Sequence, residues 1–294
     1  MIQLDRDVWR TLAKLFAATY LLQAVAILRG GEESSEFPLW IGASMLLPGI
    51  FALLHLRRAG RGWRSIGWRP GHPVYLALAL TLPALLTLAG LALFEGTGLG
   101  RQAAFWTDAS GRVATELPLL LPSESMSFAG LALNVVVTGA VMSLPIAVLT
   151  LGEEVGWRGF FQPELLKRNE LFKSVVFLGV VWALWHAPLI LAGFNYPRTP
   201  VLGAFVFFPI AAVGISAWLA WLTLRSGSIW PAALFHAGVN GVGALVFEMD
   251  FGERDLLGQS AISCGLLLSG LAALWLGTRG LAASGSSGGP DAAR

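Results

Sequence analysis

Long apolar stretches recur along this sequence and restrict the folds open to it. A helix of about 20 mostly apolar residues is long enough to cross the hydrocarbon core of a bilayer. We therefore predict an all-α, polytopic membrane bundle of about eight transmembrane helices, with residues 1–283 forming a single domain. The small, polar residues 284–294 are predicted to be a disordered tail. The eight apolar stretches are 9–28, 37–56, 73–94, 130–152, 174–191, 201–224, 229–247 and 256–277.

The composition excludes other classes of protein. Charged residues make up 13% of the chain and hydrophobic residues 55%, whereas a soluble domain carries roughly 25% charged residues. Too little charge is present to cover a soluble surface, so a soluble enzyme is excluded. A formal net charge of +2 gives no reason to expect a nucleic-acid partner. The single Cys264 excludes an intramolecular disulfide.

The basic residues predict an orientation, because loops rich in Lys and Arg stay in the cytoplasm. With both termini in the cytoplasm, fifteen of the twenty basic residues fall on the cytoplasmic side and five on the other. We therefore predict an integral protein of the cell membrane, with the Arg bias and short loops favouring a bacterial inner membrane. The five on the other side are Arg29, Arg101, Arg112, Arg198 and Arg254.

Two connections between the predicted spans are long enough to carry structure of their own. Residues 95–127 form a long outer loop in which we expect a short interfacial helix. Residues 158–173 mix aromatic, apolar and charged side chains. This mixture predicts an amphipathic cytoplasmic element that lies on the membrane surface.

Ionisable side chains inside membrane spans are costly and are functional candidates for that reason. The fourth span ends in LGEEVGWRGF, which contains Glu153, Glu154 and Arg158. Glu154 and Arg158 are spaced i,i+4 with the acid first, the favourable order for an ion pair. This pairing would leave Glu153 free to act as a general base. The alternative is a charge cluster that anchors the helix end at the interface.

Two further spans carry histidines. His186 lies deep in the fifth span, four residues after Trp182, while His236 and Asn240 share one face of the seventh. A His and an Asn one turn apart suit the donation of two hydrogen bonds to an oxyanion. The alternatives are a helix–helix hydrogen bond for His186 and a polar helix seam for His236. From their depth, we expect all these groups to converge in the cytoplasmic half of the bilayer, in a site that opens toward the cytoplasm.

These three motifs resemble those of the CPBP intramembrane proteases, which include CAAX prenyl endopeptidases and bacteriocin-processing relatives. The resemblance covers about 150–245 and includes WRGFFQPEL, LWHAPL and SGSIWPAALFHAGVN, within a predicted protease core of 130–247. It implies a metalloendopeptidase in which Glu153 and His186 activate a water. Glu154 and Arg158 would hold this arrangement. Stabilisation of the oxyanion would fall to His236 and Asn240.

The resemblance leaves the cofactor and the substrate open. Glu153, His186 and His236 are candidate ligands of a Zn²⁺ ion, and a metal-free glutamate mechanism fits the same residues. The expected substrate is a membrane-associated protein or peptide, either CAAX-like or carrying a leader peptide. The family's second motif has Phe where this chain has Trp182, which would reshape the pocket.

Other functions are compatible with the same residues. A non-enzymatic transporter or bacteriocin-immunity protein could use this polar cluster as a binding site, although no repeated halves with matched broken helices occur. A scaffold that has lost its chemistry is a further alternative. H-E-x-x-H and G-x-S-x-G motifs are absent, and no Asp lies inside a span. Helical zinc, rhomboid-like serine and paired-aspartate proteases are therefore disfavoured.

Overall fold

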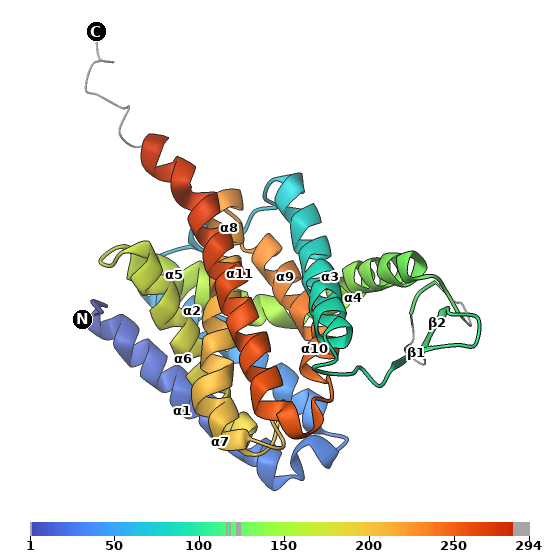
Figure 1. The fold of residues 1–294 in the computed structure, drawn as a ribbon. Coiled ribbons are helices and arrows are strands. Elements are labelled where there is room, and N and C mark those ends of the chain that lie inside the picture. Colours follow the sequence, from blue (N-terminus) through green and yellow to red (C-terminus); the bar gives the residue numbers. More distant parts are fainter. Residues whose placement is uncertain (1, 116, 118, 122–124, 285–294) are drawn as a thin grey trace.

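The computed structural model describes residues 2–115, 117, 119–121 and 125–284. Eight helical segments in this part of the chain are long and apolar enough to cross a membrane, which confirms the predicted all-α membrane bundle (Figure 1). Of the predicted tail, Ser284 is the last residue of a helix and 285–294 lie outside the described residues. The helices are α1 (Arg6–Leu28), α2 (Phe37–Arg58), α3 (Pro73–Gly96), α4 (Phe128–Gly156), α5 (Gln162–Leu166), α6 (Leu171–Leu191), α7 (Pro200–Leu202), α8 (Phe208–Ser226), α9 (Trp230–Asn240), α10 (Ala244–Phe247) and α11 (Asp255–Ser284).

Short elements complete the chain. Two strands, β1 (Phe105–Thr107) and β2 (Val113–Thr115), form an antiparallel pair. The remaining turns are the 3₁₀ turns Gly31–Glu33, Trp63–Ile66 and Gly252–Arg254 and the π-helical turns Trp157–Phe161 and Gly203–Phe207.

Local sequence signals mark where the helices begin. Asp5 caps α1 by accepting a hydrogen bond from the Asp7 amide, and Ser127 caps α4 by accepting one from the Gly130 amide. Side-chain acceptors at this position satisfy amides that have no partner within the helix. Helices α3 and α9 each have a proline in the first turn. The missing N–H of proline is tolerated there, because amides in the first turn have no hydrogen-bond partner within the helix.

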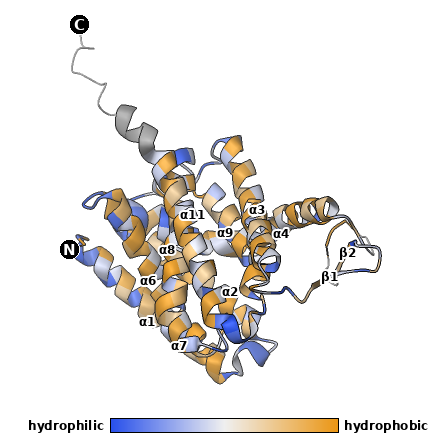
Figure 2. Ribbon diagram, in the orientation of Figure 1, coloured by the Kyte–Doolittle hydropathy of each residue, from blue (hydrophilic) through white to orange (hydrophobic). Residues whose placement is uncertain are grey.

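Apolar side chains cover much of the outside of the bundle (Figure 2). Leu28, Val148 and Leu268 are 86%, 66% and 69% exposed. A soluble protein rarely exposes so continuous an apolar surface. In a bilayer, lipid tails contact these side chains, so the described surface agrees with the integral membrane location.

The fourth span is longer than predicted. Helix α4, the π-helical turn and α5 follow one another without a break from Phe128 to Leu166, and α4 runs crosswise to α3 and α9 (Figure 1). Trp157, Phe160 and Phe161 are almost fully buried in the protein core. The prediction that 158–173 lies on the membrane surface was therefore wrong for its first half, because its aromatic residues pack inward against neighbouring helices.

Close contact with α2 fixes the position of α4. A Cβ atom added to Gly152 would lie 2.7 Å from the Met45 carbonyl oxygen, and one added to Gly156 would lie 2.5 Å from Pro48 Cβ. Cβ atoms do not approach other atoms this closely, so only glycine fits at these two positions. Small residues of this kind allow helix backbones to meet in a membrane. The Glu153–Glu154 pair lies between these two glycines, so this packing positions both carboxylates.

One end of the bundle, which we call the basic end, gathers the N-terminal segment with the α2–α3, α5–α6 and α8–α9 connections. The Asn169 side chain hydrogen-bonds to the Gln3 backbone, and the Ile229 amide donates to the Gly67 carbonyl at 3.2 Å. Arg61 forms an ion pair with α5. The connections here and the helix ends beside them carry Arg57, Arg58, Arg61, Arg64, Arg69, Lys167, Arg168, Lys173 and Arg225.

The opposite end, which we call the acidic end, gathers the α1–α2, α3–α4, α6–α7 and α10–α11 connections. Arg101 and Asp250 exchange backbone hydrogen bonds of 2.9 Å, and the Arg198 guanidinium lies 3.2 Å from the Asp250 carboxylate. The rings of Phe37 and Phe194 lie 5.8 Å apart. The chain thus sorts its connections into the two sets that the predicted spans require. Acidic residues at this end are Glu32, Glu33, Glu36, Glu95, Asp108, Glu248, Asp250, Glu253 and Asp255.

The long outer loop holds a hairpin in place of the expected interfacial helix. Strands β1 and β2 pair with Phe105 opposite Thr115 and Thr107 opposite Val113. The Asp108 carboxylate accepts hydrogen bonds from the Ser110 and Arg112 amides within the turn. Asp, Ser and Gly at a turn favour reversal of the chain over continuation as a helix.

The seventh span is divided into two helices. Helix α9 ends at Asn240, and α10 begins at Ala244, so the predicted span 229–247 is interrupted for three residues. Irregular backbone at membrane depth is tolerated where it faces protein or a cavity. Asn240, the last residue of α9, lines a cavity, so the interruption occurs where such backbone is tolerated.

Candidate active site

The two adjacent glutamates lie in the last turns of α4. Glu153 is 1% exposed and Glu154 is 0% exposed. Arg158, in the π-helical turn, donates through Nη1 to Glu154 Oε1 at 3.1 Å, and both side chains are fully buried. The predicted ion pair between Glu154 and Arg158 is present. Burial of an unpaired charge is strongly unfavourable. The ion pair reduces this cost for both Glu154 and Arg158.

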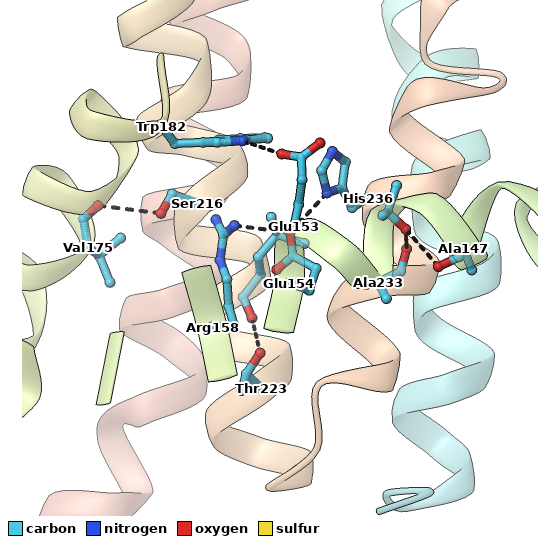
Figure 3. Close-up of polar contacts among 12 residues, drawn as sticks. Ala147, Glu153, Glu154, Arg158, Val175, Trp182, Ser216, Thr223, Ala233 and His236 are labelled. Atoms are coloured by element: carbon cyan, nitrogen blue, oxygen red, sulfur yellow. Dashed lines mark hydrogen bonds and ion pairs between the residues drawn. The ribbon is translucent and has the colours of Figure 1, made fainter. Parts of the chain in front are cut away.

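His236 of α9 joins the same carboxylate. Its Nδ1 lies 2.9 Å from Glu154 Oε1, so one oxygen contacts both Arg158 and His236 (Figure 3). An ionised carboxylate only accepts hydrogen bonds, so the imidazole carries its proton on Nδ1. Sequence reasoning had paired His236 with Asn240 and did not predict this contact between helices.

Trp182 of α6 contacts four of the six candidate residues. Its indole Nε1 donates to Glu153 Oε2 at 2.7 Å (Figure 3). The Trp182 ring centroid lies 5.5 Å from that of His186 and 5.2 Å from that of His236, in edge-to-face arrangements. The Arg158 guanidinium lies 5.2 Å from the same ring. The tryptophan therefore does more than fill space, because a phenylalanine here could not donate to Glu153.

The backbone of Trp182 also positions His186. The His186 Nδ1 lies 2.8 Å from the Trp182 carbonyl oxygen. A carbonyl accepts but does not donate, so His186 carries a proton on Nδ1 and presents the lone pair of Nε2. The ring is partly exposed, and it lines the cavity. A neutral imidazole in this tautomer can accept a hydrogen bond or a proton from a water molecule.

Polar side chains of α1 support this part of α6. Pro188 has no N–H, so the carbonyl of Leu184 loses its helical partner, and the Tyr20 hydroxyl donates to that carbonyl at 2.7 Å. The Gln23 amide donates to the Trp185 carbonyl at 3.1 Å. These contacts hold the helix turn that carries His186. The sequence signal for them was a cluster of polar residues in the first span.

A cavity of about 310 Å³ brings the reactive groups together. Glu153, His186, His236 and Asn240 line it, along with apolar side chains. Asn240 is exposed at the end of α9. Glu154 and Arg158 are not part of the lining and lie behind Glu153, where they can orient groups without touching a bound molecule.

The three candidate zinc ligands, Glu153, His186 and His236, line one cavity. Across 2–115, 117, 119–121 and 125–284, no group of three or more His, Cys, Asp or Glu side chains is arranged to hold a metal ion. Nδ1 of His236 is engaged with Glu154, and Nδ1 of His186 with the backbone. Both contacts use Nδ1 and not Nε2, and a zinc-bound histidine commonly makes such a contact through its other ring nitrogen. The candidate site of Glu153, His186 and His236 therefore stays a prediction.

Fold and site together define a polytopic helical membrane protein with a buried acid–base cluster that faces a cavity. Residues 127–242 match the family described as type II CAAX prenyl endopeptidase Rce1-like. This range contains all six candidate residues. The resemblance to the CPBP intramembrane proteases is thus confirmed over this segment.

A curated relative agrees with the family match. CAAX prenyl protease 2 of Methanococcus maripaludis is 35% identical over 94 residues, which cover 30% of this chain and 34% of the relative. The match therefore spans about a third of the length of that relative. The first three spans of the present chain lie outside the family match.

Proposed function

We propose that this protein is an intramembrane endopeptidase that hydrolyses a peptide bond in a membrane-associated protein or peptide. The family match supports protease chemistry. The observation that carries the proposal is the position of Glu153 and His186 on the wall of one cavity, each held by Trp182. A carboxylate and an imidazole around one cavity form an acid–base pair for activating a water.

Glu153 acts as the general base. A water in the cavity donates one hydrogen bond to the Glu153 carboxylate and the other to Nε2 of His186. Glu153 accepts the first proton while the water oxygen attacks the scissile carbonyl carbon. The same carboxyl then delivers the proton to the leaving nitrogen as the C–N bond breaks, yielding a free amine and a carboxylic acid, which loses its own proton to solvent water. Trp182 keeps Glu153 aimed into the cavity through its indole N–H.

His236 and Asn240 stabilise the tetrahedral oxyanion. Asn240 can donate through its side-chain amide. His236 can donate through Nε2 only when the imidazole is protonated, because Nδ1 is occupied by Glu154. The Glu154 carboxylate contacts Nδ1 of this imidazole at 2.9 Å and so fixes the orientation of the ring. Arg158 holds Glu154 in place, so Glu154 and Arg158 are positioning residues.

This chemistry uses side chains alone. In this proposal the water is activated by Glu153 and His186 without a metal step. Metal analysis of the purified protein by mass spectrometry tests this point directly. Stoichiometric zinc that is lost in a His186→Ala variant would replace the glutamate mechanism with a metal mechanism.

The test of the proposed function is a comparison of protein termini in membranes of cells that express wild type or Glu153→Gln. Glu153→Gln keeps the shape of the side chain and removes the base, so termini generated by the protease should disappear. Glu170→Gln is the matched control, because Glu170 is an exposed carboxylate at the basic end. Equal termini in wild type and Glu153→Gln, with equal expression, would refute the catalytic assignment.

A further inference from the structure

Two buried polar side chains on the wall of the cavity take no part in the proposed reaction. They are Gln23 of α1 and Ser44 of α2. Both helices lie outside the residues that match the family. Gln23 is 0% exposed and Ser44 is 2% exposed, so bulk water does not reach their polar atoms. Their hydrogen-bond partners must come from the protein or from a molecule held in the cavity.

One polar atom of each side chain has no partner within the protein. In the part of the chain that the structure describes, neither Gln23 Oε1 nor Ser44 Oγ makes a hydrogen bond. Most buried polar side-chain atoms in proteins are paired. Other buried atoms without a partner occur among the described residues, but the residues that carry them do not line this cavity. The wall therefore carries one free acceptor and one hydroxyl that can donate or accept.

A contact with α6 places the Gln23 side chain beside His186. Gln23 Nε2 donates to the Trp185 carbonyl at 3.1 Å, and Trp185 immediately precedes His186. A carbonyl only accepts, so the NH₂ end of the amide faces α6 and Oε1 is directed away from that carbonyl. The free acceptor is thus held next to one of the two groups proposed to activate the water.

Close packing of α2 on α4 places Ser44 beside the other group, Glu153. The carbonyl oxygen of Met45, the residue after Ser44, lies 2.7 Å from the position of a Cβ atom added to Gly152, and Gly152 immediately precedes Glu153. A serine inside a helix often donates to the carbonyl four residues earlier. The Ser44 hydroxyl has no such bond, so it remains available to a bound molecule.

An extended peptide in this cavity would need partners of this kind. Most of its residues carry one backbone N–H and one C=O, and burying either group without a hydrogen bond is unfavourable. Gln23 Oε1 can accept from an N–H, and the Ser44 hydroxyl can donate to a C=O. Apolar side chains, which can do neither, make up much of the rest of the wall, among them Ile41, Met45, Leu189, Phe208 and Ile215.

We propose that Gln23 and Ser44 form a subsite that binds the backbone of the substrate next to its scissile bond. The role of this subsite rests on the proposed protease function. Gln23 Oε1 accepts a hydrogen bond from a substrate amide, and Ser44 Oγ donates one to a substrate carbonyl. Because the subsite is attached to the helix turns of His186 and Glu153, it sets which peptide bond reaches the activated water. Contacts with the backbone are independent of the substrate side chains, which meet the apolar wall.

Ser44→Ala tests the subsite without breaking a hydrogen bond within the protein. Its melting temperature should match that of the wild type. For a peptide that spans a terminus dependent on Glu153, KM should rise about fivefold at an unchanged kcat, as for a contact that only binds. Ser263→Ala is the matched control, because this buried serine donates to the Gln259 carbonyl at 2.8 Å and does not line the cavity, so its KM should not change. A lower melting temperature for Ser44→Ala with an unchanged KM would overturn the assignment.

Backbone esters test Gln23, because an ester in place of one amide removes a single N–H from the peptide. At one position next to the scissile bond, the ester should raise KM of the wild type about fivefold. The same ester should have no further effect on Gln23→Met, because the two changes remove the same hydrogen bond. Tyr20→Phe also loses a bond from α1 to α6 but does not alter the lining, so it should stay sensitive to the ester. Equal sensitivity of wild type and Gln23→Met at every position would show that Gln23 does not bind the substrate backbone.

Glu153→Gln, measured with the same peptide, separates the subsite from the protease function. If Glu153→Gln cleaves as fast as the wild type, the protease assignment fails and the subsite loses its substrate. If cleavage requires Glu153 but Ser44→Ala and Gln23→Met both keep the wild-type KM, the protease function stands and the subsite is wrong. A raised KM in both variants, with cleavage still dependent on Glu153, supports the subsite.

Discussion

Replacing Trp182 with Phe would remove a single hydrogen-bond donor from the centre of the site. The indole N–H donates to Glu153 Oε2 at 2.7 Å. Phe retains an aromatic ring in the space between His186 and His236, whose rings pack edge-to-face on Trp182. The backbone carbonyl that holds His186 is unchanged. The variant therefore tests the contribution of the bond to Glu153 alone, because the other contacts of Trp182 in the site are retained.

The size of the effect follows from the charge on the acceptor. Hydrogen bonds to charged groups contribute roughly 1.5–3 kcal/mol, and the site is buried, so water does not replace the lost donor freely. Each 1.36 kcal/mol of barrier corresponds to about a tenfold change in rate. We expect kcat of Trp182→Phe to fall by about ten- to a hundredfold. KM should change little, because the apolar wall that contacts substrate is retained.

The assay is steady-state cleavage of a verified peptide substrate by purified protein in bilayers, with kcat and KM measured separately. Trp185→Phe is the matched control. Its indole donates at 2.8 Å to the hydroxyl of Thr19 and not to a carboxylate, so its loss should lower thermal stability more than kcat. If Trp182→Phe keeps full kcat, or if Trp185→Phe loses as much, Trp182 does not position the base.

Three further predictions follow from the same geometry. Glu154→Gln should lower both the stability of the protein and kcat, because Arg158 and His236 lose the buried carboxylate that they share; unchanged stability and kcat would contradict this role. Gly156→Ala should destabilise the protein by about 1–3 kcal/mol through overpacking against Pro48, whereas Gly265→Ala, where nothing lies within 4 Å of an added Cβ, should not lower the melting temperature. Prolonged chelation should leave cleavage unchanged, and loss of activity that zinc restores would argue for a metal site.

Much of the architecture could be predicted, because the length of an apolar stretch is enough to identify a membrane-spanning helix. Apolar length alone located the eight spans, and helical spacing alone predicted the ion pair between Glu154 and Arg158. Both of these predictions use only residues that lie close together in the sequence. The three polar motifs could also be assigned to one cluster, because few other ionisable residues lie inside the spans.

The remaining features depend on contacts between distant segments. The bond from Trp182 to Glu153 and that from His236 to Glu154 join residues 29 and 82 positions apart, and no local pattern encodes such pairs. The inward packing of Trp157 was hidden for the same reason, since its amphipathic surroundings also suit a membrane surface. Tyr20 could have been suspected, because Pro188 must leave one carbonyl without its helical donor.

The buried ion pair has a consequence for how the chain enters the bilayer. Glu154 and Arg158 lie one turn apart on the same continuous segment, so their charges can neutralise each other as soon as that segment becomes helical. His236 is synthesised 82 residues after its partner Glu154. The fourth span can therefore insert with its most costly charges already matched, and the histidine contact forms later, when the seventh span packs against it.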